Sequence, residues 1–142
     1  MVGSLDQASD DAASRAEVEI AAAGLLTRAR EYLREGWCQG ADATDLLGQP
    51  VHPWSEQACH WSLLGAIVAA LDGPRAVPAG QLSLPALAVA MAALADLIYE
   101  PSLVAWNDHP GRLQTTLLDL LDRASALCLA RAQSTNAPTH LQ

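Results

Sequence analysis

The fold is decided by the stretch Ser55-Glu-Gln-Ala-Cys-His-Trp-Ser-Leu-Leu-Gly-Ala-Ile-Val-Ala-Ala-Leu-Asp-Gly73. Its only charged residues, Glu56 and Asp72, stand at its two ends. Drawn as a helix, the stretch has apolar residues on every face, which is typical of a helix that other helices bury, and it is too short to span a bilayer. We therefore expect a central core helix over Ala58–Leu71, with Ser55 as its N-cap.

The rest of the chain is typical of a helical domain that covers this core. Its 142 residues suit one domain, and its richness in Ala and Leu favours helix over strand. Apolar spacing predicts three more main helices and one short helical turn. The first helix begins with the capping box Ser14–Glu17 and ends near Gly36. The second runs from Ser83 to Glu100, and the short turn covers 102–106. The last helix is capped by Asn107 or Asp108, has Pro110 in its first turn and runs past Cys128.

These elements define the expected fold class and domain organisation. We predict an all-α, single-domain bundle of about four main helices plus one or two short turns. The helical domain covers residues 14–133, between a flexible N-terminal segment (1–13) and a flexible C-terminal tail (134–142). A loop over 39–53, which contains two glycines and two prolines, joins the first two helices.

Charge and cysteine content exclude several function classes. The net charge is −8, and all eight basic residues are arginines with no clustered basic face, so nucleic-acid binding and lysine chemistry are not expected. Three widely spaced cysteines, at 38, 59 and 128, favour free thiols in the cytoplasm. We see no metal-ligand spacing, no signal peptide and no membrane span, and we expect no cofactor.

Three short stretches are candidates for a functional site. They are Trp37-Cys38-Gln39-Gly40, Cys59-His60-Trp61 and Trp106-Asn107-Asp108. In an antiparallel bundle the ends of the helices that carry them meet at one end, so we expect the stretches to converge.

The chain has four tryptophans and no phenylalanine. Trp37, Trp54, Trp61 and Trp106 all flank the proposed end of the bundle. Two interpretations stay open: the indoles form a small aromatic core, or they wall a pocket for a flat or cationic small molecule.

Cys38, His60 and Asp108 also have the side chains of a nucleophile, base and orienting acid. However, the negative end of a helix dipole raises the pKa of a thiol, which makes Cys38 a poor nucleophile. Each of these residues also has a structural interpretation in place of a functional one. Cys38 would be a half-buried residue of a turn, and Asn107 and Asp108 would be helix caps. Arg112 is expected to pair with Asp108 or Glu100, or to hold an anionic group together with open helix amides.

Taken together, the motifs resemble a known family. The runs Trp-Cys-Gln-Gly (37–40), Ala-x-x-Trp-x-Leu-x-Gly-Ala-Ile (58–67) and Trp-Asn-Asp-x-Pro-Gly-Arg-x-Gln (106–114) are similar to a domain-of-unknown-function family of actinobacteria and their phages. The resemblance covers roughly residues 15–130, and Leu113 departs from the Thr expected there. It implies a helical fold and no particular activity.

Three hypotheses about function follow. The first, which we favour, is a module that binds a small molecule or a partner segment at the tryptophan-lined end of the bundle. The second is a small cyclase or hydrolase of a specialised pathway that uses His60 with Asp108 or Cys38. The third is an adaptor that forms a homodimer through the alanine-rich helix. The predicted ligand-binding residues are Trp37, Gln39, Trp61, Trp106, Asn107 and Arg112.

Overall fold

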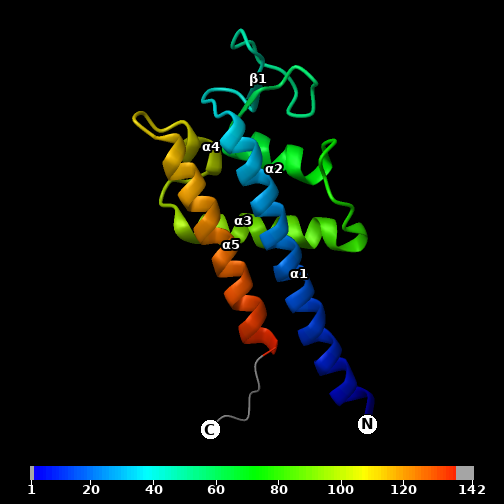
Figure 1. Cartoon of the computed structure of the whole chain (residues 1–142). Helices are drawn as coiled ribbons and strands as arrows, with labels where there is room; N and C mark the ends of the chain where they lie inside the picture. The colour runs from blue at the N-terminus through cyan, green and yellow to red at the C-terminus, as the bar shows by residue number, and fades with distance from the viewer. Residues whose placement is uncertain (1, 137–142) are drawn as a thin grey trace.

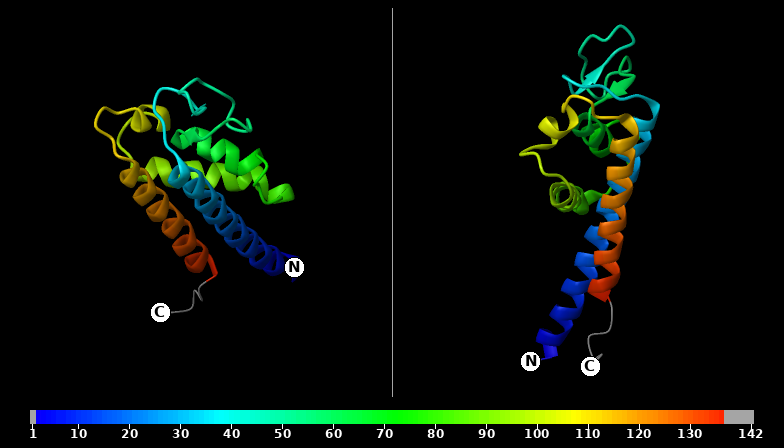
Figure 2. Two further views of the ribbon diagram at one scale, coloured as in Figure 1. Left: turned by 45° about the horizontal axis from the view of Figure 1, so that its top comes forward. Right: turned by 90° about the vertical axis from the view of Figure 1, so that its left-hand side faces the viewer.

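Two long helices form the frame of the molecule. The computed structural model describes residues 2–136, with side chains over 14–134. Helices α1 (Val2–Glu35) and α5 (Gln114–Asn136) lie side by side and run in opposite directions (Figure 1). Helices α2 (Leu63–Asp72) and α3 (Ser83–Leu97) lie on one side of this pair, and α3 crosses it (Figure 2). The fold is mostly helical, as predicted.

The structure also contains a small sheet, so the all-α prediction holds only in part. Strands β1 (Ala43–Thr44) and β2 (His60–Trp61) pair antiparallel, with Ala43 opposite Trp61. A 3-10 turn, η1 (Gly80–Leu82), precedes α3. The short helix predicted over 102–106 is present as α4 (Leu103–Asn107), and the hydroxyl of Ser102 accepts a hydrogen bond from the Ala105 amide at its start.

The predicted central helix begins later than expected. Helix α2 starts at Leu63, where the hydroxyl of Ser62 accepts from the Gly65 amide, and Ser55 instead closes a tight turn. The backbone from Cys59 to Ser62 is extended, because the amides of Cys59, Trp61 and Ser62 bond to carbonyls of neighbouring segments rather than within a helical turn. Within α2 most side chains are buried, as predicted.

Helix α1, rather than α2, is the centre of the packing, because it contacts α2, α3 and α5. It begins at Val2, so the expected flexible segment 1–13 is helical from its second residue, and the predicted capping box at Ser14 lies inside the helix. No proline interrupts this segment. The core includes the buried residues Leu25, Leu26 and Leu33 of α1, Leu63 and Ile67 of α2, Leu94 of α3, and Leu117 and Leu121 of α5.

Helix α5 also begins later than predicted. Asn107 ends α4 and Asp108 caps it, so neither residue starts the last helix. A turn that contains Pro110 and Gly111, the latter with φ of 83°, leads to the first helical residue, Gln114. At its other end α5 extends to Asn136, so the predicted tail is helical over 134–136, and residues 137–142 lie outside the described part of the chain.

The segment Gly80–Leu97, which contains η1 and α3, is unusually apolar. Among the described residues it is the one helical segment long and apolar enough to cross a membrane, with a mean hydropathy of 1.4 over 18 residues. Core helices can pass this test too, and the inner face of α3, with Ala90 and Leu94 fully buried, packs against α1 and α5. The outer face is exposed at Leu84, Ala88 and Ala92.

The buried thiol of Cys128 makes the stability of this core dependent on pH. Burial, followed by the negative charge of Glu19 on α1, raises the pKa of Cys128 from 9.0 to about 11. The folded state favours the neutral thiol more than the unfolded state does. The stabilisation that the neutral Cys128 thiol gives the folded state is therefore complete below pH 9 and is lost as the pH rises to about 11. We expect the free energy of unfolding to fall by about 2–3 kcal/mol over this interval.

Urea denaturation at several pH values between 8 and 11.5 would measure this fall. The Cys128→Ala variant should lose the contribution of about 2–3 kcal/mol that the Cys128 thiol makes to this fall. Parallel losses of stability in wild type and Cys128→Ala would show that another group is responsible.

Candidate functional site

The side chain of Asn107, which is 1% exposed, connects three separate segments of the chain. Its Oδ1 accepts hydrogen bonds from the Trp37 indole Nε1 and from the Leu63 amide, both at 2.9 Å. Its Nδ2 donates to the Cys38 carbonyl at 3.1 Å and to Asp108 Oδ1 at 2.9 Å. The amide therefore uses both donors and both acceptor positions, and it fixes α4 to the end of α1 and the start of α2.

A second set of hydrogen bonds joins the same two loops. Gln39 Nε2 donates to the carbonyls of Asn107 (3.0 Å) and His109 (3.1 Å). Asp108 Oδ1 accepts from the amide of Gly40 at 3.0 Å, and Gly40 has φ of 83°, which a glycine adopts without strain. The Trp37–Gly40 and Trp106–Asp108 stretches are thus bound to each other along their length.

The third predicted stretch joins them through its backbone. The Trp61 amide donates to the Gly36 carbonyl and the Cys38 amide donates to the Trp61 carbonyl, both at 3.1 Å. The prediction that the three stretches converge at one end of the bundle is confirmed.

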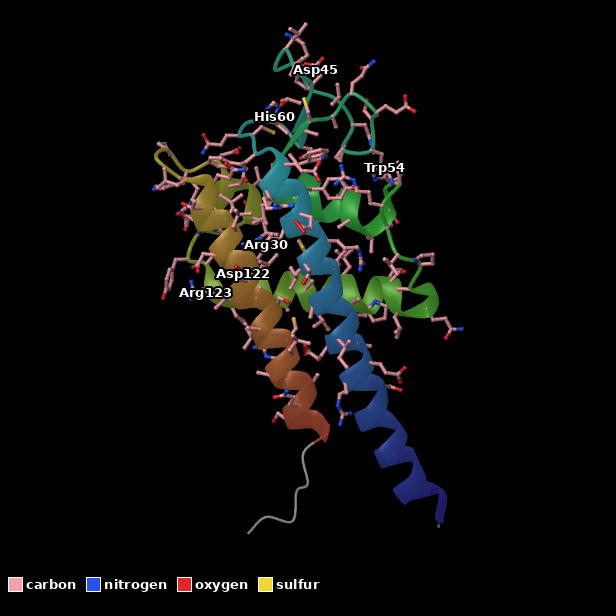
Figure 3. The ribbon with its side chains drawn as sticks, viewed as in Figure 1. Arg30, Asp45, Trp54, His60, Asp122 and Arg123 are labelled. Atoms are coloured by element: carbon pink, nitrogen blue, oxygen red, sulfur yellow. The ribbon has the colours of Figure 1, made fainter. Side chains whose placement is uncertain are left out.

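Most of the tryptophans are packed within this junction. Trp37 donates to Asn107, and Trp61 is 4% exposed and donates to the Pro53 carbonyl at 3.1 Å. The Trp61 ring also makes an edge contact with Tyr32, with ring centroids 4.9 Å apart. Trp54 is half-exposed and lies apart from His60 (Figure 3). These contacts favour the interpretation of a small aromatic core.

Arg112 holds the far side of α4 in place. Its guanidinium lies 4.1 Å from the centre of the Trp106 ring, and its Nε donates to the Trp106 carbonyl at 2.9 Å. Its Nη2 donates to Glu100 Oε2 at 2.8 Å. Of the two carboxylates predicted as partners, Glu100 is therefore the one that forms the ion pair.

The environment of Cys38 does not favour a reactive thiolate. Burial raises the pKa of the Cys38 thiol, a side-chain hydrogen bond with Thr44 partly opposes this effect, and the negative charges of Asp108 and Asp42 raise the pKa further. The sulfur lies 3.5 Å from the Ala41 carbonyl, to which it donates a weak hydrogen bond. The structure brings Cys38 and Asp108 together, but in an arrangement that keeps the thiol protonated.

His60 lies on β2, opposite Thr44, and its Nδ1 is 3.6 Å from the sulfur of Cys59. Over the part of the chain that the structure describes, no hydrogen bond or ion pair joins His60 to Asp108 or Cys38. The catalytic roles of these three residues remain predictions.

A groove opens beside this junction, between α3, the 98–102 connection and α4. It encloses about 500 Å³, and its walls are largely apolar side chains with the Glu100 carboxylate at one edge. The lining residues are Leu64, Met91, Ala92, Ala95, Ile98, Glu100, Pro101, Ser102, Leu103 and Val104. No tryptophan contributes to this lining.

A smaller polar cleft lies next to the groove. It has a volume of about 140 Å³ and contains the side chains of Asp42, Ser62 and Asp108. Val104 lines both spaces, so α4 forms the wall between them. Within residues 14–134, no three His, Cys, Asp or Glu side chains gather closely enough to hold a metal ion.

The fold and the junction define a class of protein: a small helical domain whose 37–62 loop is attached to a short helix by a buried asparagine. The chain belongs to the family of unknown function DUF6197, whose model matches residues 17–127. The chain therefore lies in a family of unknown function, as predicted from the sequence. Comparison with curated proteins and with solved structures gives no match.

The groove is the feature that sequence reasoning missed. Ala92 and Ala95 are exposed on α3, the alanine-rich helix that the third hypothesis assigned to homodimer formation. One signal was present: the apolar run Leu97-Ile98 stops at Tyr99, and the chain then turns at Pro101 into a second apolar helix. This pattern places two apolar helices next to each other, but the shape of the space between them depends on how Asn107 and Arg112 hold α4.

Proposed function

We propose that this protein is a non-catalytic binding module that holds a small, mostly apolar molecule in the groove between α3 and α4. The observation that carries the proposal is the groove itself. Its volume of about 500 Å³ lies within the range of small-molecule sites, and its lining combines many apolar side chains with few polar ones.

In this proposal the motif residues position the groove and do not contact the ligand. Asn107 and Gln39 tie the end of α4 to the loop after α1, and Arg112 ties α4 to the connection that carries Glu100. Since α4 is one wall of the groove, these contacts keep it open in the absence of ligand. Trp37 and Trp106 act in the same way, as partners of Asn107 and Arg112.

The chemistry of the lining favours an uncharged ligand. The Glu100 carboxylate is neutralised by Arg112, and the other polar lining side chain, Ser102, uses its hydroxyl as a helix cap. Met91 gives the groove a flexible wall that can adapt to ligand shape. We expect recognition by shape and apolar contact, with Glu100 as one hydrogen-bond acceptor at the edge.

Binding of the neutral apolar dye Nile red, followed by its fluorescence, tests the proposal. Ala92→Trp places a large side chain in the groove and should weaken binding at least about 10-fold, because the ligand volume is lost. Ala88→Trp is the matched control, since Ala88 is also exposed on α3 but does not line the groove. It should leave the dissociation constant within about twofold of wild type.

Equal losses in the two variants would mean that the dye covers the outer face of α3, and the groove proposal would fail. Saturable binding of an apolar peptide, with no binding of the dye, would assign the groove to a partner segment instead. Circular dichroism should show that both variants keep the helical content of wild type.

The cytoplasm is the location that we propose, on the basis of the free cysteines. The enzymatic alternative has less support, because the Cys38 thiol is held protonated and His60 is not bonded to Asp108 or Cys38. An actinobacterial origin rests on the motif resemblance alone.

A further inference from the structure

The outer face of α3 is apolar and uncharged. The helix lies on one side of the α1–α5 pair (Figure 2), and Leu84, Ala88 and Ala92 are exposed on it. These positions, at i, i+4 and i+8, share one side of the helix, and Leu84 is 73% exposed. The sequence has no charged residue over 76–95, and the first one after this run, Asp96, pairs with an arginine of α5. Such a face favours association with another apolar surface.

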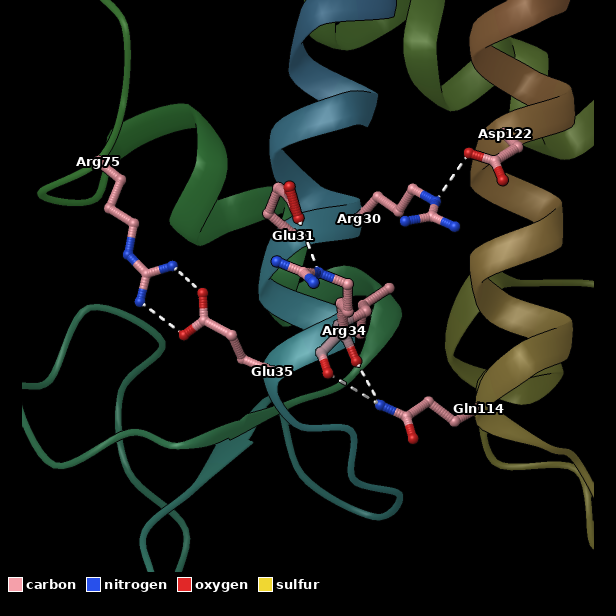
Figure 4. A network of polar contacts seen from close by, with 8 residues as sticks. Arg30, Glu31, Arg34, Glu35, Arg75, Gln114 and Asp122 are labelled. Atoms are coloured by element: carbon pink, nitrogen blue, oxygen red, sulfur yellow. Dashed lines mark hydrogen bonds and ion pairs between the residues drawn. The ribbon is translucent and has the colours of Figure 1, made fainter.

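Elsewhere the surface carries charges in pairs. Arg30 of α1 forms an ion pair with Asp122 of α5, and Arg75, from the turn after α2, reaches Glu35 of α1 (Figure 4). The net charge of the chain is −8, so two copies repel each other on average. A two-fold contact brings a face onto itself, and any charge near the axis then meets a like charge. The uncharged face of α3 avoids this repulsion.

We propose that this face is the interface of a two-fold dimer, in which the α3 helices of two copies run in opposite directions with Ala88 near the axis. In such a contact, residue i of one copy meets residue j of the other, and j meets i. Because positions 84 and 92 are equally spaced about 88, Leu84 of each copy meets Ala92 of the other. A large side chain thus packs on a small one at both ends, and Ala88 lets the helices approach closely.

The second copy also contributes to the groove between α3 and α4. Ala92 lines this groove and Leu84 does not, so Leu84 of the second copy lies at the mouth of the groove and covers part of its open side. Val104, which is 46% exposed on the opposite wall, adds apolar area for the contact. This contribution to the groove rests on the proposed function, whereas the dimer does not.

The size of the face predicts a weak dimer. Stable complexes typically bury about 800 Å² on each partner, which is more than one helix and the edge of a groove provide. We therefore expect a dissociation constant of about 10–100 µM. A membrane surface is less suited to the same face, because helices that lie on membranes carry basic residues beside their apolar face, and 76–95 has none.

Sedimentation equilibrium at about 5 to 500 µM protein tests the dimer, and wild type should pass from monomer to dimer over this range. Leu84→Asp should raise the dissociation constant at least about 10-fold, because the contact would bury carboxylates against apolar side chains. Leu46→Asp is the matched control, since Leu46 is 84% exposed on the 37–62 loop, and it should leave the constant unchanged. A monomer at every concentration, or equal losses in the two variants, would overturn the proposal.

Ala88→Cys tests the position of the axis. Two thiols at this position face each other in the dimer, so oxidation with diamide should give a disulfide-linked dimer. Leu129→Cys, at a 44% exposed position on α5, should give no more cross-linking than wild type. Cross-linking through Leu129→Cys and not through Ala88→Cys would contradict the proposed contact.

Nile red binding at about 1 µM protein, where the monomer predominates, separates this inference from the proposed function. Leu84→Asp should keep the dye binding of wild type, because Leu84 does not line the groove. Dye binding without a dimer contradicts the dimer alone, and a dimer without dye binding contradicts the proposed function alone. Flotation of wild type, but not of Leu84→Asp, with phosphatidylcholine vesicles and no dimer in solution would assign the face to a membrane instead.

Discussion

Gly65→Ala is expected to prevent the chain from folding at 25 °C. A Cβ atom on Gly65 would lie 1.8 Å from the carbonyl oxygen of Asp42 and 2.7 Å from its carbonyl carbon. Both atoms belong to the backbone, and this carbonyl accepts a hydrogen bond from the Ser62 amide at 3.0 Å, so the loop cannot move away without losing the start of α2. We expect a loss of more than about 4 kcal/mol of unfolding free energy.

Circular dichroism and urea denaturation would measure this effect. Gly24→Ala is the matched control, because Gly24 also lies inside a helix and the nearest atom to its Cβ would be Arg28 Nη1 at 3.4 Å. There alanine should stabilise the protein by about 0.5–1 kcal/mol, since it is a better helix former than glycine. A well-folded Gly65→Ala protein would show that the loop is not pinned to α2 in the way we describe.

Asn107→Ala is expected to have the second largest effect. It removes the acceptor of the Trp37 indole and of the Leu63 amide, and leaves both donors in a buried site. We expect a loss of about 3–5 kcal/mol, because each unpaired buried donor costs about 1–3 kcal/mol and the lost side chain leaves a cavity. Gln39→Ala, which removes two bonds at a more exposed position, should cost only about 1 kcal/mol.

Asn107→Asp distinguishes the acceptor role of the Asn107 side-chain oxygen from the donor role of its Nδ2 group. The oxygen that accepts from Trp37 and Leu63 is kept, but the Nδ2 donor becomes a second oxygen that faces Asp108 Oδ1 and the Cys38 carbonyl. The variant should therefore be severely destabilised at pH 7 and should recover part of its stability below pH 5, where a shared proton restores a donor. Urea denaturation at pH 7 and pH 4.5 would test this, and an equal deficit at the two pH values would contradict it.

Part of the candidate site was predictable because the relevant signals are local. The spacing of apolar residues located the four main helices and the short turn predicted over 102–106, which is present as α4. An antiparallel arrangement of those helices was enough to bring Trp37, Trp61 and Trp106 to one end of the molecule. The groove between α3 and α4 was not predictable, since its shape depends on how α4 is held by Asn107 and Arg112.

Helix boundaries show most clearly what the sequence left open. Ser55 and Ser62 are both good N-caps, and local propensity does not distinguish them. The choice is made by residues far away in the sequence, because the Cys59 amide bonds to the Thr44 carbonyl and the Trp61 amide to the Gly36 carbonyl. Those bonds need an extended backbone up to Ser62.

By itself, the sequence determined that this chain forms a mostly helical domain, because apolar periodicity and helix propensity act over a few neighbouring residues. Only the tertiary structure decided what its special residues do. Gly36 looks like a helix stop, yet a Cβ there would lie 2.1 Å from the Cys59 carbonyl oxygen, and Asn107 looks like a cap but is a buried connector. Such roles depend on atoms from distant segments, whose approach is fixed only when the whole core packs.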